Sequence, residues 1–186
     1  MQKIDSAKIA KGVEALIKEN ATLKQLKGVT NAELEAVYSL AFGYYRTGKY
    51  DEAIKLFQFL VLFDHLNQKY WMGLGAVQQV LKDFQNAIVS YGYCSFLNLE
   101  NPKPQLHAAE CFLAMGDKRN AASSLEALNE YCPKDTDIGR EYRAKAAKMR
   151  ELIGEEVFAA LAKEDEDAEK KGVTFFADVC RQGEQG

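Results

Sequence analysis

The chain has 186 residues, which is enough for one domain whose core needs neither disulfides nor a metal. Hydrophobic residues make up 47% and charged residues 27% of the sequence, the balance of a globular domain rather than of a disordered segment. The formal net charge is −3, and since proteins that neutralise phosphates carry a basic face, nucleic acid is not expected as a partner.

The N-terminus and the cysteines indicate a soluble cytoplasmic protein. Residues 1–6 contain no basic region followed by an apolar core, so they do not resemble a signal peptide. The apolar run at residues 59–63 is far shorter than the roughly 20 residues that span a bilayer, so we expect no direct membrane insertion. The four cysteines form no CxxC pair and accompany only two histidines, so we expect reduced core thiols, no metal site and no cofactor. They are Cys94, Cys111, Cys132 and Cys180.

Residues 2–20 are predicted to form an amphipathic helix, because their aliphatic residues lie toward one side. A single helix of this length is marginally stable in water unless it packs, and we expect it to pack against a second copy of the chain. We therefore assign residues 1–33 to an N-terminal helix and linker that mediates homodimerisation. The expected interface residues are Ile9, Val13, Leu16 and Ile17. Residues 21–29 are predicted to be a linker that contains a short turn of helix.

From residue 34 onward the sequence repeats with a period of 34 residues. The clearest column of the repeat is Ala53, Ala87 and Ala121, followed by Phe57, Tyr91 and Leu125 and then by Leu60, Cys94 and Leu128. Further columns are Tyr50, Phe84 and Lys118; Phe63, Leu97 and Tyr131; and Leu40, Leu74 and Ala108, each of these last followed by a small residue. The turn position of the repeat is occupied by Gly48, Lys82 and Gly116.

This pattern is typical of the tetratricopeptide (TPR) repeat, in which a first helix, a glycine-containing turn and a second helix follow one another. Small residues mark the point where the two helices cross, since a larger side chain would push their axes apart. We place the repeats at residues 34–67, 68–101 and 102–135. The predicted fold is an all-α TPR helical-repeat solenoid of three repeats, with an N-terminal helix and a C-terminal capping helix.

The sequence after the third repeat is predicted to cover the end of the solenoid, whose last repeat would otherwise expose its apolar face. Thr136 or Asp137 can cap a helix there, and Gly154 is expected to end it. The side chains that this helix would present to the last repeat are Ile138, Tyr142, Met149 and Ile153. A further helical segment leads into a run of mixed charges. We assign residues 136–171 to capping and C-terminal helices and residues 172–186 to a flexible tail.

A stripe of three aromatic residues marks a candidate groove on the first helix of the first repeat. Tyr38, Phe42 and Tyr45 follow i, i+4, i+7 spacing and share one helical face. Core alone is the other interpretation of aromatics at this spacing, but Leu40, Ala41 and Tyr44 already supply core positions, so we expect a peptide-binding groove. The equivalent positions read Lys69, Met72, Ala76 and Gln79 in the second repeat, and Leu106, Glu110 and Leu113 in the third.

The residue types of this groove favour an extended segment with aliphatic anchors. They lack the converging Lys, Asn and Arg that would hold the terminal carboxylate of a heat-shock chaperone. Each buried aliphatic anchor contributes roughly 1.5–3 kcal/mol, so two or three anchors give about micromolar binding after the cost of ordering the segment. The sequence Arg46-Thr47-Gly48-Lys49 is only a fragment of a phosphate loop, and no nucleophile accompanies the histidines. We predict no catalytic residues and no enzyme activity.

The stretch Tyr38-Ser39-Leu40-Ala41-Phe42 begins a series of short motifs that point to one family. The others include Gly48-Lys49-Tyr50, Phe57-Gln58, Asp64-His65, Gly73-Leu74-Gly75-Ala76, Ser90-Tyr91 and His107-Ala108-Ala109-Glu110-Cys111. Over about residues 10–150 the chain resembles the class II chaperones of bacterial type III secretion systems, the SycD/LcrH-type translocator chaperones.

The resemblance implies a cytoplasmic chaperone for hydrophobic, pore-forming translocator proteins. It further implies that an extended translocator segment, often of PxLxxP type, lies in a concave groove that contains Tyr38, Phe42 and Tyr45. Members of the family commonly self-associate, often through the N-terminal helix, and some also join a transcriptional regulator. Residues from about 155 on extend beyond the usual end of the family. Two alternatives stay open at this point, a generic TPR scaffold and a regulator that binds a transcription activator through the same groove.

Overall fold

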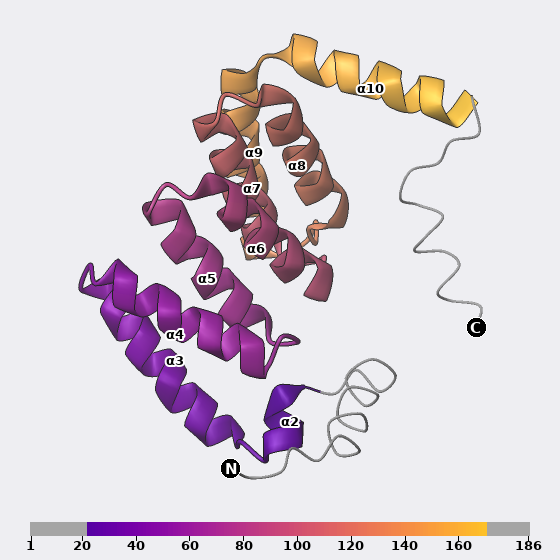
Figure 1. Cartoon of the computed structure of the whole chain (residues 1–186). Helices are drawn as coiled ribbons and strands as arrows, with labels where there is room; N and C mark the ends of the chain where they lie inside the picture. The colour runs from indigo at the N-terminus through magenta and orange to yellow at the C-terminus, as the bar shows by residue number, and fades with distance from the viewer. Residues whose placement is uncertain (1–21, 171–186) are drawn as a thin grey trace, which may run out of the picture.

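The computed structural model describes residues 22–170, and among these residues it contains helices and turns but no strand (Figure 1). After the short helix α2 (Leu23–Lys27) come three helix pairs, which are α3 (Asn31–Arg46) with α4 (Tyr50–Phe63), α5 (Gln68–Val80) with α6 (Phe84–Leu97), and α7 (Pro102–Ala114) with α8 (Lys118–Tyr131). Helices α9 (Asp137–Ile153) and α10 (Glu155–Lys170) complete this part of the chain. The helices of the three pairs pack mainly on their neighbours in the sequence, so the predicted all-α TPR solenoid is confirmed.

Two predicted segments lie outside the described residues. One is the helix over residues 2–20, with the expected dimer-interface residues Ile9, Val13, Leu16 and Ile17. The other is the tail at residues 172–186. The linker that precedes the first repeat is described from residue 22, and α2 is the short turn of helix expected there. Gly28, at φ 68°, ends α2, and Lys24 ties it to the first repeat through a 2.6 Å ion pair from its Nζ to Asp64 Oδ2.

The repeat columns form the core of the solenoid. Ala53, Ala87 and Ala121 are fully buried at the crossings of the paired helices. The columns that follow them are buried as well, and their members are Phe57, Tyr91, Leu125, Leu60, Cys94 and Leu128. In the small-residue column, a Cβ on Gly75 would lie 2.7 Å from the Tyr91 ring, so only glycine lets α5 and α6 approach this closely. The 34-residue period thus corresponds to one layer of core per repeat.

Two residues expected in the core are exposed. Leu40 lies half exposed on α3, whereas Leu74 and Ala108 of the same column are buried. The difference follows from position, because α5 and α7 each pack against the preceding pair and α3 begins the stack among the described helices. Ile138 is likewise exposed, at the start of α9, while Ile153 at its end is buried.

The turn column adopts the left-handed backbone conformation in all three repeats. Gly48 and Gly116 have φ values of 76° and 80°, and Lys82 has φ 62° although it is not glycine. The left-handed conformation costs a residue with a Cβ roughly 1–2 kcal/mol. The second repeat therefore carries local backbone strain that the other two avoid.

Replacing Lys82 by glycine is expected to raise the free energy of unfolding by about 0.5–1 kcal/mol, since relief of the strain exceeds the added entropy of the unfolded chain. Urea unfolding followed by circular dichroism measures the change. The control is Lys55→Gly in the middle of α4, where an exposed helical residue is lost and stability should fall by about 1 kcal/mol. A loss of stability in both variants would contradict the proposed strain at position 82.

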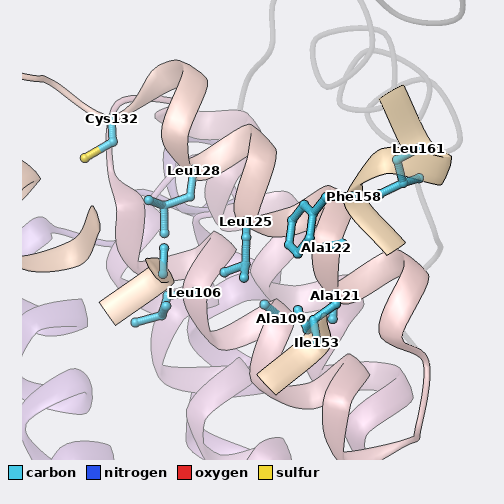
Figure 2. Packing of buried hydrophobic residues seen from close by; sticks show 11 residues of the cluster. Leu106, Ala109, Ala121, Ala122, Leu125, Leu128, Cys132, Ile153, Phe158 and Leu161 are labelled. Carbon is cyan, nitrogen blue, oxygen red and sulfur yellow. The ribbon is translucent and has the colours of Figure 1, made fainter. Parts of the chain in front are cut away.

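Helices α9 and α10 cover the end of the third repeat. Thr136 caps α9, since its side chain accepts a hydrogen bond from the Gly139 backbone, and Gly154 separates the two helices. Figure 2 shows Ile153 beside Ala121 and Phe158 beside Ala122, so both helices contribute to the core over α8. An ion pair between Arg119 of α8 and Glu164 of α10 lies further along the same contact. The apolar end of the third repeat is thus covered by both α9 and α10, the helices before and after Gly154.

Candidate functional site

The first helices of the first two repeats enclose a pocket of about 200 Å³. Six residues predicted for the groove line it, namely Tyr38, Phe42 and Tyr45 from α3 and Lys69, Met72 and Ala76 from α5. Phe57 from α4 and Gly73 from α5 complete the lining. The pocket is predominantly apolar and forms between successive repeats rather than on one helix.

The aromatic stripe is a continuous stack along the pocket wall. The ring centroids of Tyr38 and Phe42 are 6.3 Å apart with an interplanar angle of 8°, and those of Phe42 and Tyr45 are 6.4 Å apart at 26°. Such spacing lies within the range in which aromatic pairs attract one another. Phe42 is the exposed member, with 44% of its surface accessible.

The stripe also contacts the core of the first repeat. Tyr38 meets the Phe57 ring edge-on at 6.0 Å, and Tyr45 meets Tyr50 at 5.9 Å. Both tyrosines are partly buried against the first core cluster. The expectation that the stripe is separate from the core is therefore wrong for these two residues, which lie at the border between core and pocket. Phe42 alone faces away from the core.

Phe57 and Gly73 form a part of the pocket that the sequence pattern did not predict. A Cβ on Gly73 would lie 2.1 Å from the Phe57 ring, so the absence of a side chain on α5 gives this ring its place. A glycine inside a helix costs about 1 kcal/mol relative to alanine, which makes its occurrence there a signal of close packing. The period alone assigned Phe57 to the core and gave no reason to place it at the pocket.

Lys69 lies at the rim of the pocket. Its Nζ is 3.0 Å from Glu35 Oε2 and 4.6 Å from the centre of the Tyr38 ring. Both partners of the ion pair are about half exposed, so the pair contributes little to stability. Its charge nevertheless marks one end of the apolar wall.

A second pocket, of about 330 Å³, adjoins the first and shares Tyr45 and Ala76 with it. Its other lining residues are Gln79, Val80, Tyr91, His107 and Glu110, so α7 of the third repeat contributes to it. Two further residues predicted for the groove, Gln79 and Glu110, thus lie next to the aromatic stripe. We call the two pockets together the groove.

A chain of hydrogen bonds crosses the second pocket. Tyr91 Oη donates to Gln79 Oε1 at 2.7 Å, and Gln79 Nε2 donates to Glu110 Oε2 at 2.9 Å. His107 Nδ1 lies 2.8 Å from the same Oε2, and its ring stacks on Tyr91. These contacts lower the pKa of Glu110, chiefly through the hydrogen bond from His107, although partial burial opposes the shift. Glu110 is therefore an ionised carboxylate at neutral pH.

Leu106 and Leu113 do not line either pocket. Leu106 is only 4% exposed and lies with Leu125 and Leu128 in the last core cluster, as Figure 2 shows for Leu106 beneath Leu128. Leu113 is partly buried against the same cluster. Helix α9 packs on α7 as well as on α8, and its Ala146 and Ile153 belong to the same cluster as Leu106. Leu106 is a core residue rather than a groove residue.

The described residues contain no group of three or more His, Cys, Asp and Glu side chains that is arranged to hold a metal ion. None of the helices between residues 22 and 170 is long and apolar enough to cross a membrane. Cys94, Cys111 and Cys132 are buried, and burial raises the pKa of the Cys94 thiol to about 12 and that of Cys111 to about 11. These two cysteines are therefore core thiols of low reactivity.

A helical-repeat solenoid with an apolar groove between its repeats is a protein-binding module. The tetratricopeptide-repeat family matches residues 34–67 and 69–101 in one form and residues 105–135 in another. The chain is also 34% identical over 149 residues to the low calcium response locus protein H of Yersinia pestis, covering 80% of this chain and 88% of that protein. It is 32% identical over 127 residues to the chaperone protein SicA of Salmonella typhimurium, covering 68% of this chain and 77% of SicA.

Solved structures agree with these relatives. The type III secretion translocator chaperone SycD of Yersinia enterocolitica is 34% identical and superposes with a TM-score of 0.66 over 71% of this chain and 98% of its own. A type III secretion complex from Aeromonas hydrophila gives 36% identity and a TM-score of 0.72, over 77% and 95% of the two chains. PcrH, solved with the chaperone-binding region of PopD, is 34% identical and superposes with a TM-score of 0.64. The match covers 68% of this chain and 94% of the PcrH chain. The chain belongs to the family of type III secretion translocator chaperones.

Proposed function

We propose that this protein is a cytoplasmic chaperone that holds an extended segment of a hydrophobic translocator in the groove. The observation that carries the proposal is the apolar pocket between α3 and α5, with Phe42 exposed in the middle of its aromatic wall. PcrH, whose structure is similar over most of its length, was solved with the chaperone-binding region of PopD. A segment of the same kind would find anchors for its aliphatic side chains in this pocket.

The physical basis of the proposed activity is the masking of apolar surface. A protein that is to insert into a membrane exposes apolar segments, and these aggregate while they are unpartnered in water. A chaperone that buries such segments keeps the translocator soluble and competent for secretion. Each aliphatic side chain buried in the groove contributes roughly 1.5–3 kcal/mol, which is enough for binding that is reversible at export. The activity needs binding alone, so we propose a chaperone and not an enzyme.

Co-expression with the translocator proteins of the same organism tests the proposal. With the chaperone present, each translocator is expected to move from the insoluble to the soluble fraction and to co-purify with the tagged chain. A transcriptional regulator recovered instead of a translocator would favour the regulatory alternative. If translocators stay insoluble and none is recovered with the chain, the proposed function is wrong.

We also propose that the chain forms a homodimer through residues 1–33, as its apolar residues Ile9, Val13, Leu16 and Ile17 favour. SycD, the 34% identical relative, has been crystallised in an arrangement described as an alternative dimer. Deletion of residues 1–20 is expected to convert the dimer to a monomer, because it removes the apolar face that pairs. Sedimentation equilibrium over a wide concentration range measures this. A monomeric intact chain at the highest concentration would contradict the proposal.

A further inference from the structure

Glu110 lies in the groove, and in the described part of the chain only one of its two carboxylate oxygens is engaged in hydrogen bonds. Its side chain lies in the second pocket and is 40% exposed. Both Gln79 Nε2 and His107 Nδ1 contact the Oε2 atom. Within residues 22–170, Oε1 accepts no hydrogen bond. A carboxylate has about four lone-pair sites, so one side of this group is available to a ligand in the groove.

The surroundings of Glu110 favour a cation. The groove wall beside it is aromatic, since Tyr45 and Tyr91 line the same pocket, and aromatic faces attract cations as a carboxylate does. The charge of Glu110 is also partly shielded from solvent, which strengthens its attraction to an opposite charge. A ligand without a cation or another strong donor would remove water from this carboxylate and leave its Oε1 atom without a hydrogen bond, at a cost to binding.

The protein itself does not supply that cation from α9. Lys145 is the one lysine that contributes electrostatically to the lowered pKa of Glu110. Its Nζ is held by Glu141 Oε1 at 2.6 Å and lies 4.6 Å from the centre of the Tyr142 ring. At the other end of the groove, Lys69 is paired with Glu35. Lys145 and Lys69 are thus engaged with other partners, and the Oε1 atom of Glu110 remains for a ligand.

We propose that Glu110 recognises a lysine or arginine side chain of the bound translocator segment, next to the apolar anchor held by Phe42 and Tyr45. This inference rests on the proposed function and assigns a chemistry to each pocket of the same groove. Because the pockets share Tyr45 and Ala76, the cation and the anchor lie close together on the segment. Side chains at i and i+2 of an extended chain point to the same side, which allows both to enter the groove.

The inference predicts that Glu110 discriminates among apolar segments. A segment with a correctly placed cation gains a charge-assisted hydrogen bond, whereas a purely apolar segment gains only burial. The specificity of the groove would then come from the second pocket and its affinity from both pockets. The binding should weaken with added salt, because the pair is only partly buried.

The test uses the full chain and a synthetic peptide of the translocator segment that the co-expression experiment identifies. Glu110→Gln removes the charge and keeps an oxygen for Gln79 and His107, and it is expected to weaken peptide binding by about five- to thirtyfold. The matched control is Glu100→Gln, an exposed carboxylate outside both pockets that changes the net charge equally. A peptide with its lysines and arginines replaced by glutamine should bind wild type and Glu110→Gln with the same affinity. Thermal melts verify that each variant is folded.

The outcomes separate this inference from the proposed function. If Phe42→Ala weakens binding but Glu110→Gln and the glutamine-substituted peptide bind as wild type, the groove stands and the role of Glu110 is wrong. If Glu110→Gln weakens both peptides equally, Glu110 acts without a cation on the segment and the inference is overturned. If the intact chain binds no translocator segment, the proposed function fails and this inference fails with it. Restored binding between Glu110→Lys and a peptide with glutamate in place of the cation would support the direct pair.

Discussion

Replacing Phe158 by alanine is expected to lower the free energy of unfolding by about 3–5 kcal/mol, the range for a phenylalanine removed from a packed core. Phe158 is 2% exposed and lies over α8, next to Ala122. The Arg150 guanidinium is 3.7 Å from the centre of its ring, so the substitution also removes a cation–π contact. Both effects weaken the packing of α10 on the third repeat.

A matched substitution on the neighbouring helix isolates this effect. Leu152 lies near the end of α9 but is 73% exposed, so Leu152→Ala is expected to change the free energy of unfolding by no more than about 0.5 kcal/mol. Urea unfolding of both variants, followed by circular dichroism, gives the comparison. Equal stability of the two variants would show that α10 does not pack on α8 in solution. The assignment of α10 as a helix that covers the third repeat would then be wrong.

The fold could be predicted from the sequence because repetition multiplies a weak local signal. One buried alanine on a helix says little, but Ala53, Ala87 and Ala121 at equal spacing specify the same crossing three times. The turn column behaves similarly, since Lys82 adopts the left-handed conformation of the glycines with which it aligns. The 34-residue period therefore predicted the turn at Lys82, although lysine by itself argues against a left-handed backbone conformation.

Periodicity failed where the environment of a repeat differs from that of its neighbours. Leu40 lies on the first helix of the first described repeat and is exposed, although Leu74 and Ala108, the equivalent residues of the next two repeats, are buried. Leu106 is equivalent to Tyr38 and Met72, which line the first pocket, yet it lies in the core cluster that α7 forms with α8, α9 and α10. Terminal repeats meet different partners, so a column predicts their burial less well.

The groove was predicted only in part because a pocket depends on side chains from several helices. The stripe on α3 was visible as a spacing within one helix. The contribution of Tyr91 from α6 and His107 from α7 was not, since neither occupies a position that the sequence assigned to the groove. They are the 34-residue equivalents of Phe57 and Gly73, which line the first pocket. Gly73 could have been noticed as a glycine inside a helix, but its partner Phe57 lies on α4 and becomes apparent only in the structure.

Phe42→Ala is expected to weaken binding of the translocator segment by roughly 1–3 kcal/mol, about five- to a hundredfold, with little change in stability. The reason is that Phe42 stacks on both Tyr38 and Tyr45 in the pocket wall, while 44% of its surface faces solvent. Calorimetric titration with the synthetic segment measures the affinity. Tyr38→Ala should differ, because the contact of Tyr38 with Phe57 means that its loss lowers the melting temperature as well as the affinity.

The matched control for Phe42→Ala is Phe96→Ala, the same substitution at a phenylalanine of α6 that is 79% exposed and lines neither pocket. If exposed aromatic surface alone attracted the translocator, the two variants would lose affinity together, and the groove would have no special role. A loss confined to Phe42→Ala assigns the anchor to the first pocket, because both variants remove the same side chain and only one of them lines it. A melting temperature for Phe42→Ala far below that of wild type, with normal binding by the folded fraction, would instead make Phe42 a core residue and end its assignment to the groove.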